Sequence, residues 1–498
     1  MDFIKKVLQT GLLIILISAL ICCGKQDSSS RFPQKIDPFL FKSAVELTDA
    51  IRRGEITSLD LLNRYLDSIE RNNGSINAVV ALDVDAARAR AAEADQALAR
   101  GQIWGPLHGL PMTVKDVFEV AGMPATSGDL KLKSYIPDRN AIAVQRLIDA
   151  GAIIFGKTNV PYHARDFQSF NKVYGTTNNP WDLTRTPGGS SGGSASALAA
   201  GFTSLELGSD LGGSVRFPAH YTGVFGHKTT FGIVPRYGHI PPIPGRVQPH
   251  QMSVIPLFVI GPLSRSAEDL ALSLKILTTP GRSEKSGHSS ELLPTRRKQF
   301  SDYRVAVWFT DSSPAAEIDA DVLAPLQKTV GKLREAGLAV DEEARPDLQL
   351  WETVHLWREM RDELTAGSLP LSNGLVSRQK KQQSKWAEFF ERYDVLLAPV
   401  ALSVAFPHNH REPVINRRLD VNGKKKPYFD NLSWTAMAIV SGLPATVAPV
   451  GLSESGLPVG IQIIGAKFED RTTIAFAMSL SDLVGGFKAP PGFLDQQR

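Results

Sequence analysis

Cysteine is nearly absent from this chain. Two of its 498 residues are cysteine, and both, Cys22 and Cys23, stand close to the N-terminus. The rest of the chain therefore holds no intrachain disulfide, no cysteine nucleophile and no thiolate metal site. A nucleophile in the folded part has to come from another residue type.

The chain also lacks a strong excess of charge of either sign. It has 55 Lys and Arg against 51 Asp and Glu, a formal net charge of +4, and no long basic block interleaved with aromatic residues. This pattern is not that of a nucleic-acid groove, and we expect no nucleic-acid partner. We expect the short run Lys424–Lys426 to be a solvated loop. A hydrophobic content of 43% and a charged content of 21% fit a globular chain with one large α/β domain or two to three smaller ones.

Near the N-terminus, the apolar run is too short to cross a bilayer comfortably. Residues 11–21 are apolar, Lys5 and Lys6 precede them, and Cys22-Cys23-Gly24 follows. This order resembles a bacterial lipoprotein leader, so we expect residues 1–23 to be a signal peptide and 24–40 a polar tether. The protein is then exported, as a periplasmic protein or a membrane-anchored lipoprotein. Acylation of Cys23, plain secretion and an uncleaved anchor all remain open.

Beyond the tether, short apolar strands alternate with helices, which predicts an α/β fold. Ser43 is the first residue of a predicted capping box, and Thr57 marks the start of a second predicted helix. We expect strands at 109–114, 153–157, 204–208, 305–309, 395–399, 445–450 and 459–465, and helices at 86–100, 143–150, 194–200 and 434–440. The globular part is expected to run from 41 to 485, with a mostly helical segment at about 310–392.

Two serine-glycine clusters are the most informative feature: TPGGSSGGS at 186–194 and GSDLGGS at 208–214. A flexible linker is the plain alternative for the first, but a structured stretch precedes it and an Ala-rich helix follows it. A phosphate-binding loop would need a Gly-Lys-Ser/Thr ending, which is missing. A nucleophile elbow would need a strand immediately before it, where Pro187 cannot donate to a sheet ladder.

A lone lysine, Lys115, stands at the end of the strand predicted at 109–114. A serine needs a base to become a nucleophile, and an amine can serve in place of an imidazole. The second cluster suits an oxyanion hole, because the successive N–H groups of Leu211, Gly212 and Gly213 can converge on one oxygen.

Taken together, these motifs resemble the amidase signature family. The resemblance runs from about residue 43 to about 477 and is most specific over 188–216, GGSSGGSASALAAGFTSLELGSDLGGSVR. Supporting stretches are GLPMTVKD at 109–116, GKTN at 156–159, TNNPW at 177–181 and GLPVGIQ at 456–462. The resemblance implies a single α/β/α sandwich around a mixed β-sheet.

It also implies a catalytic Ser–cis-Ser–Lys triad without a cofactor. Ser214 would be the nucleophile, Ser190 the bridging serine after a cis peptide bond from Gly189, and Lys115 the base. Supporting roles around the nucleophile loop would fall to Ser191, Asp210 and Arg216. By the same analogy the acyl pocket would be lined by residues 162–169, where Arg165 and Asp166 are polar.

This chemistry requires a neutral Lys115. Holding a lysine neutral at pH 7 costs about 4.6 kcal/mol in water, and burial lowers a lysine pKa by ~3–5 units. The apolar flank of Lys115 favours such burial. Asp116 would stabilise the charged form, so we expect its side chain to point away.

The expected activity is hydrolysis of linear carboxamides to a carboxylate plus ammonia or an amine. An alternative is the glutamine-hydrolysing subunit of an aminoacyl-tRNA amidotransferase, and another is a non-catalytic binding protein. The histidine pair His408 and His410 is interpreted as part of a solvated loop and not as a metal site.

Overall fold

The computed structural model describes residues 37–240, 257–282, 292–366 and 370–493. Asp37–Phe493 form one compact unit. The predicted leader and most of the predicted tether, up to residue 36, lie outside the described residues. Within the described ranges, no helix combines the length and the apolar character that spanning a membrane requires.

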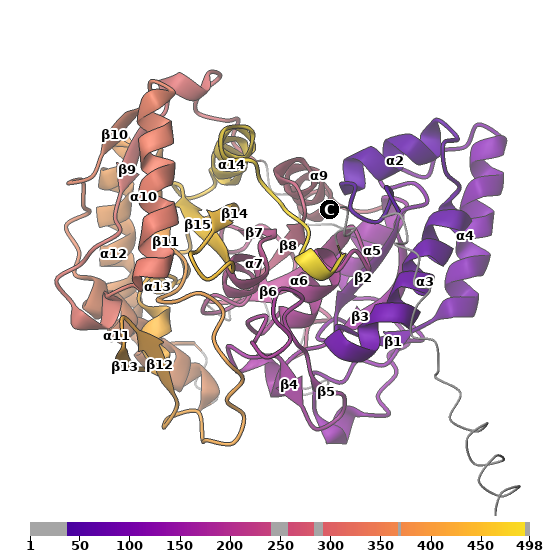
Figure 1. Ribbon diagram of the computed structural model, residues 1–498, viewed down its shortest axis with the longest axis horizontal. Coiled ribbons are helices and arrows are strands. Elements are labelled where there is room, and N and C mark those ends of the chain that lie inside the picture. Colours follow the sequence, from indigo (N-terminus) through magenta and orange to yellow (C-terminus); the bar gives the residue numbers. More distant parts are fainter. Residues whose placement is uncertain (1–36, 241–256, 283–291, 367–369, 494–498) are drawn as a thin grey trace, which may run out of the picture. The chain divides into compact units, whose positions relative to one another are not determined.

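A single mixed sheet of eleven strands runs through the unit (Figure 1). In spatial order its strands are β1 (Val79–Leu82), β3 (Ile153–Thr158), β2 (Pro111–Lys115), β6 (Leu205–Asp210), β8 (Val259–Ser264), β7 (Phe225–Lys228), β14 (Ala445–Leu452), β15 (Pro458–Ile464), β11 (Val395–Pro399), β9 (Arg304–Val307) and β10 (Ala339–Asp341). β2 runs parallel to β3 and β6, and β9 runs parallel to β10 and β11. The other neighbouring strands pair antiparallel.

Helices cover both faces of this sheet. Thr446 and Val447 are consecutive residues of β14, so their side chains point to opposite faces. Thr446 hydrogen-bonds Thr473 of α14 (Asp470–Val484) on one face. On the other face, Val447 and His220 of α7 (Arg216–Thr222) both lie next to Gly460. α9 (Ala267–Thr278) packs with α14, and α6 (Gly192–Ala199) packs with α7. The predicted α/β/α sandwich around a mixed sheet is confirmed.

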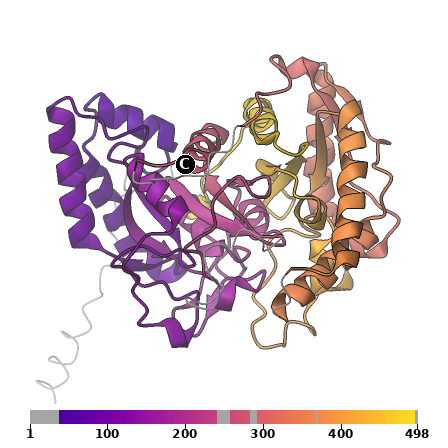
Figure 2. The same cartoon turned by 180° about the vertical axis from the view of Figure 1, so that it is seen from behind.

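The remaining helices lie toward the two ends of the sheet, and Figure 2 shows the same arrangement from behind. At the β1 end are α2 (Ala44–Arg52), α3 (Ser58–Ile76), α4 (Val84–Ala99) and α5 (Ile142–Asp149). At the β10 end are α10 (Ala320–Glu335), α11 (Leu350–Thr365), α12 (Asn373–Arg392) and α13 (Ala436–Val440).

Local sequence signals explain where several elements begin. Ser43 and Glu46 form the predicted capping box of α2, and Thr57 caps α3 by accepting from the N–H of Asp60. β2 is buried at all five positions, as expected for a parallel strand covered on both faces.

The strands β1, β7 and β8 were not predicted from the sequence, and two further regions differ from what was predicted for them. The segment predicted as mostly helical at about 310–392 contains α10, α11 and α12, but β10 interrupts it and adds an edge strand to the sheet. The run Lys424–Lys426, predicted as a loop, lies in β13 (Lys424–Pro427), which pairs with β12 (Arg418–Val421). Leu419 and Val421 of β12 are buried, and this burial favours a hairpin despite the lysines.

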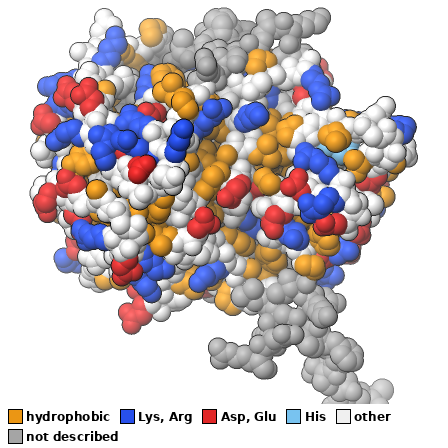
Figure 3. Space-filling model, turned by 90° about the horizontal axis from the view of Figure 1, so that it is seen from above, with side chains coloured by type: hydrophobic (Ala, Val, Ile, Leu, Met, Phe, Trp, Pro, Cys, Tyr) orange, Lys and Arg blue, Asp and Glu red, His pale blue; other side chains and the backbone are white. Residues whose placement is uncertain are grey.

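On the outside, charges of both signs are mixed. Figure 3 shows Lys and Arg side chains interspersed with Asp and Glu on one face. This distribution matches the small net charge of the chain.

Candidate active site

Lys115 is the last residue of β2, the third strand from the β1 edge of the sheet. β2 and β6 run parallel with Val114 opposite Leu207, so their carboxyl ends meet at the same edge. Nζ of Lys115 lies 2.7 Å from Oγ of Ser190 and 3.0 Å from Oγ of Ser209. The lysine and the first serine cluster, 75 positions apart in the chain, therefore meet at the end of this strand.

The side chain of Lys115 is fully buried. Burial lowers the pKa of Lys115 to about 7, against the opposing effect of the Asp210 charge. A large fraction of the side chain is therefore neutral near pH 7, and its nitrogen then has a lone pair that can accept a proton.

Asp116 points away from Lys115, as predicted. Its carboxylate accepts from the N–H and the hydroxyl of Thr126 and lies 3.5 Å from Nζ of Lys157. Lys157 is the partner of Asp116, so this carboxylate does not hold Lys115 in its charged form.

Ser190 sits in the loop that leads into α6. The peptide bond between Gly189 and Ser190 is cis, as the family resemblance implies. A Cβ on Gly189 would collide with the carbonyl oxygen of Asp166, so only glycine fits there. The hydroxyl of Ser169 donates to the carbonyl of Gly188 and ties the loop to its neighbour.

Ser214 lies between β6 and α7 and is partly exposed, whereas Ser190 is buried. The N–H of Ser191 donates to the carbonyl of Ser214 at 3.1 Å. The two serine clusters are thus joined through their backbones, and Ser214 is the more accessible of the two serines to a substrate.

Asp210 and Arg216 form a buried clamp around this turn. The carboxylate of Asp210 accepts from Nε of Arg216 at 3.1 Å and from another guanidinium nitrogen at 2.9 Å. It also accepts from the N–H groups of Gly213 and Val215, at 2.7 and 3.1 Å. Burial raises the pKa of Asp210, but Arg216 and the backbone N–H groups lower it by more, so the pKa stays below its ordinary value.

One of the three N–H groups predicted for the oxyanion hole is already engaged within the protein. Because the N–H of Gly213 already donates to Asp210, it is not available to a substrate oxygen. In the described part of the chain, the N–H groups of Leu211, Gly212 and Ser214 donate to no backbone carbonyl. The geometry therefore favours these three donors over the predicted set of Leu211, Gly212 and Gly213.

Two residues from distant segments orient this turn. Nε1 of Trp357 in α11 donates to the carbonyl of Leu211 at 2.8 Å, and the Thr435 hydroxyl donates to the carbonyl of Gly212 at 2.8 Å. In a trans peptide the N–H points opposite to the C=O, so the Trp357 contact fixes the direction of the Gly212 N–H. No signal in the sequence marks Trp357 or Thr435 for this role.

The side chain of Ser191 adds no hydrogen bond to this turn among the described residues. Its hydroxyl is buried without a hydrogen-bond partner among the described residues, and it lies against Gly208. Ser191 contributes through its backbone N–H and not through a side-chain network.

Asp166, predicted to bind substrate, is engaged by other residues of the protein. Its carboxylate is 2.6 Å from a guanidinium nitrogen of Arg417 and accepts from the hydroxyl of Tyr428 at 2.7 Å. These contacts join segments about 250 positions apart and use both carboxylate oxygens. Arg165, the other polar residue of the predicted acyl pocket, is exposed.

Beyond the predicted triad, sequence reasoning missed Ser209 and His239 as neighbours of Lys115. Ser209 precedes Asp210 at the end of β6, and its hydroxyl lies 3.0 Å from Lys115 and 2.9 Å from Nε2 of His239. Ser190 and Ser214 are marked in the sequence by their glycine neighbours, whereas His239 follows a single Tyr-Gly pair that belongs to no motif.

Histidines do not form a metal site in the ranges that the structure describes. His408 and His410 are partly buried, and the ring of His410 stacks on Phe170 at 3.9 Å, so the predicted solvated loop is more packed than expected. His227 is buried between Asp470 and Thr446 and serves packing.

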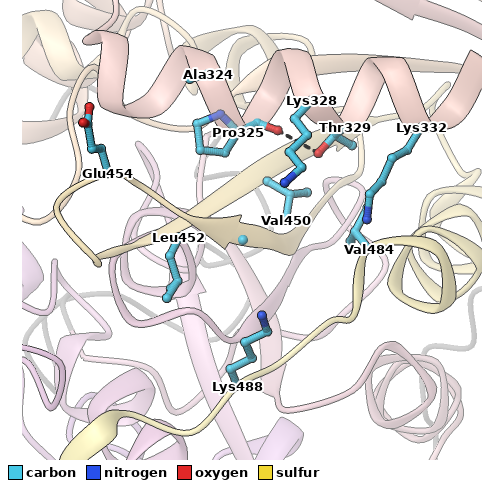
Figure 4. Close-up of a pocket in the computed structure, with 11 residues that line it drawn as sticks. Ala324, Pro325, Lys328, Thr329, Lys332, Val450, Leu452, Glu454, Val484 and Lys488 are labelled. Carbon is cyan, nitrogen blue, oxygen red and sulfur yellow. Dashed lines mark hydrogen bonds between the residues drawn. The ribbon is translucent and has the colours of Figure 1, made fainter.

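A separate hollow of about 480 Å³ lies between α10, the end of β14 and the segment after α14 (Figure 4). Lys328, Lys332 and Lys488 line it, together with apolar residues such as Leu452. Its lining includes none of the triad residues, so it is distinct from the candidate active site.

Comparisons with known proteins all point to one family. The family model described as Amidase matches residues 60–358 and 354–474. Fatty-acid amide hydrolase 2-A from Danio rerio is 33% identical, over 93% of this chain and 92% of that protein. A glutamyl-tRNA(Gln) amidotransferase subunit from Anaeromyxobacter sp. (strain K) is 31% identical, over 88% of this chain and 95% of that protein.

Solved structures give the same picture. The crystal structure of an amidase is 28% identical, covers 89% of this chain and 100% of its own, and superposes with a TM-score of 0.72. A bacterial aryl acylamidase of the amidase signature family is 23% identical with a TM-score of 0.75, over 90% of this chain and 97% of its own, and this likeness shows the fold alone. The chain belongs to the amidase signature family and is a hydrolase of amide C–N bonds.

Proposed function

We propose that this protein is an exported serine amidase that cleaves linear carboxamides through a serine acyl-enzyme. Ser214 is the nucleophile, Ser190 the bridging serine and Lys115 the base. The products are a carboxylate and ammonia or an amine, and the residues of the chain suffice without a cofactor.

The observation that carries this proposal is the buried amine of Lys115 at 2.7 Å from the Ser190 hydroxyl. Because burial brings the pKa of Lys115 to about 7, the base is available in its neutral form at neutral pH. A surface lysine at a strand end would be charged and would have no such contact.

The proposed reaction begins with two proton transfers. Neutral Lys115 takes the Ser190 proton while Ser190 takes the Ser214 proton, and Oγ of Ser214 forms a bond to the carbonyl carbon. The carbonyl π electrons move onto oxygen, and the N–H groups of Leu211, Gly212 and Ser214 stabilise that charge.

Collapse of this intermediate breaks the C–N bond. The leaving nitrogen takes the proton back from Lys115 through Ser190, and Ser214 retains the acyl group as an ester. Water then attacks the ester, loses its proton through the same relay and releases the carboxylate.

The residues at the site do not restrict the substrate to one class of amide. Asp166 is occupied by Arg417 and Tyr428, so it gives no argument against long apolar acyl groups. Relatives named fatty-acid amide hydrolases and amidotransferase subunits have nearly equal identity to this chain. A panel that runs from acetamide to long-chain fatty amides, with glutamine included, distinguishes these classes.

Turnover of this panel tests the proposal. We expect wild-type protein to hydrolyse at least one amide and to be labelled by a fluorophosphonate probe. Ser214→Ala abolishes both, while Ser384→Ala, on α12, leaves both unchanged. Equal labelling of Ser214→Ala and wild type contradicts the assignment. Glutamine as the sole substrate favours the amidotransferase alternative.

Export is proposed from residues 1–23, which lie outside the described residues. The positive residues, the apolar run and Cys23 support a lipoprotein leader. Fractionation of cells that express the full chain tests it: we expect the protein in the envelope fraction, and Cys23→Ala to release it from the membrane. Recovery of the mature protein from the cytoplasm contradicts export.

A further inference from the structure

The hydrogen-bond chain at the site continues past the triad. Oγ of Ser209 lies 3.0 Å from Nζ of Lys115 on one side and 2.9 Å from Nε2 of His239 on the other. All three residues are at least nine-tenths buried. The proposed reaction steps use neither Ser209 nor His239.

His239 is held in place by the segment that follows Lys115. The N–H of Glu119 donates to the carbonyl of Gly238 at 2.8 Å, and the N–H of Ile240 donates to the carbonyl of Val117 at 2.6 Å. The backbone on both sides of His239 is therefore bound to residues that begin two positions after the lysine.

Aromatic contacts fix the plane of the imidazole. The ring of Phe118 meets it edge-on at 5.3 Å, and the ring of Phe258 lies 4.4 Å away at a tilt of 57°. Nε2 thus faces the Ser209 hydroxyl in a defined orientation.

The hydrogen-bond donors and acceptors of Lys115 and Ser209 limit how the two side chains can pair. A neutral lysine amine has two N–H donors and one lone pair, and the base needs that lone pair directed at Ser190. Ser209 offers Lys115 two acceptors, its hydroxyl at 3.0 Å and its carbonyl at 3.4 Å. The hydroxyl acts only as an acceptor toward Lys115 when its own proton is donated elsewhere.

We propose that His239 is a positioning residue for the relay, through Ser209. Nε2 of neutral His239 accepts a hydrogen bond from the Ser209 hydroxyl. The Ser209 oxygen then accepts a hydrogen bond from Lys115, and the lysine lone pair stays directed at Ser190. Without that acceptor, the Ser209 hydroxyl turns and donates to the lone pair, in competition with Ser190. This inference rests on the proposed function of Lys115 as the base.

Two amide substitutions form a matched test. In His239→Gln the amide oxygen takes the position of Nε2, whereas in His239→Asn the amide is shorter and corresponds to Nδ1. We expect the Gln variant to keep kcat within ~3-fold of wild type and the Asn variant to lose ~10–100-fold, less than the full value of a general base. KM stays within ~2-fold in both, because His239 acts on the relay and not on substrate binding.

A second substitution separates this role from a structural one. Adding Ser209→Ala to His239→Asn removes the hydroxyl that competes for the lysine lone pair, so the double variant is expected to have a higher kcat than His239→Asn alone. A double variant whose loss equals the product of the two single losses overturns the proposal. So does a His239→Gln variant that is as slow as His239→Asn.

Folding is checked by near-UV circular dichroism and the thermal midpoint of each variant. If His239→Asn does not fold, His239→Leu carries the same expectation for kcat and for its recovery with Ser209→Ala. Failure of this inference is distinct from failure of the proposed function: the former leaves a wild-type enzyme that depends on Ser214, and the latter leaves no turnover in any variant.

Discussion

Lys115 shows how one residue combines a structural and a chemical requirement. It ends a buried strand, so its charge is disfavoured by its surroundings, and the serine hydroxyls around it satisfy its hydrogen bonds without a carboxylate in direct contact. Asp116, the adjacent carboxylate, is turned toward Lys157. The low pKa of Lys115 is therefore a property of its position at the strand end.

Replacement of Lys115 by Met removes the proposed base and preserves most of the side-chain volume. We expect kcat/KM to fall by ~10²–10⁴, the usual contribution of a general base. In wild type, kcat/KM is expected to rise with pH through about 7 as Lys115 loses its proton, and then to level off. A pH profile of both proteins checks this, and an acidic limb that persists in Lys115→Met would assign the titration to another group.

At the scale of elements, the turn between β6 and α7 depends on Asp210. Asp210→Asn leaves the Arg216 guanidinium buried without its counter-charge, and we expect a loss of ~3–5 kcal/mol in the free energy of unfolding. Urea denaturation measures it. As a control, Glu359→Gln breaks an exposed ion pair with Arg378 and is expected to cost less than ~1 kcal/mol.

Two Gly→Ala substitutions test the loop before α6. A Cβ at Gly189 collides with the backbone of Asp166–Gln168, so Gly189→Ala is expected to displace Ser190 and to reduce amide turnover by ~10²-fold or more. Gly331, inside α10, has open space around it, and Gly331→Ala is expected to raise stability by ~0.8–1 kcal/mol with no effect on turnover. Amide turnover and thermal melting of both variants test these expectations. A Gly189→Ala variant with wild-type turnover would contradict the claim that only glycine fits at position 189.

Most elements of this fold follow from local sequence signals. β11 has the predicted bounds, and the helices that begin after Ser43 and Thr57 start where their caps predict. The strands that were not predicted include β1, β7 and β8 of the main sheet. β10 and β13 were missed because a short edge strand and a lysine-rich hairpin carry little alternation, and pairing partners decide their structure.

At the scale of the whole molecule, the helical segment near the β10 end reaches the turn that holds Ser214. Trp357 of α11 donates to the carbonyl of Leu211, 146 positions away. Trp357→Phe keeps an aromatic ring and removes the donor, so we expect kcat to fall by ~3–10-fold with KM unchanged, as for loss of one neutral hydrogen bond. Steady-state kinetics on one amide test it, and an altered KM at constant kcat would place Trp357 in substrate binding instead.

The site itself was only partly predictable from the sequence. Lys115, Ser190 and Ser214 stand in motifs with distinctive composition, and the structure brings Lys115 and Ser190 into contact. The contact of Asp166 with Arg417, 251 positions away, and the contact of Ser209 with His239, 30 positions away, could not be predicted, because neither partner stands in a recognised motif. Partners that only the folded sheet brings together leave no local signal.

Two interior amines make folding a proton-releasing event. Burial sets the pKa of Lys115 at about 7, and burial with the Arg216 charge does the same for Lys228, whereas both hold a proton up to about 10.5 in the unfolded chain. Between these limits the unfolded chain carries more protons, so alkaline conditions favour the native protein, by up to ~1.4 kcal/mol per pH unit for each amine. As the pH falls from about 10.5 toward 7, this stabilisation is lost. Below about pH 7 the folded and unfolded chains hold the same protons on these amines, so their effect on stability levels off there.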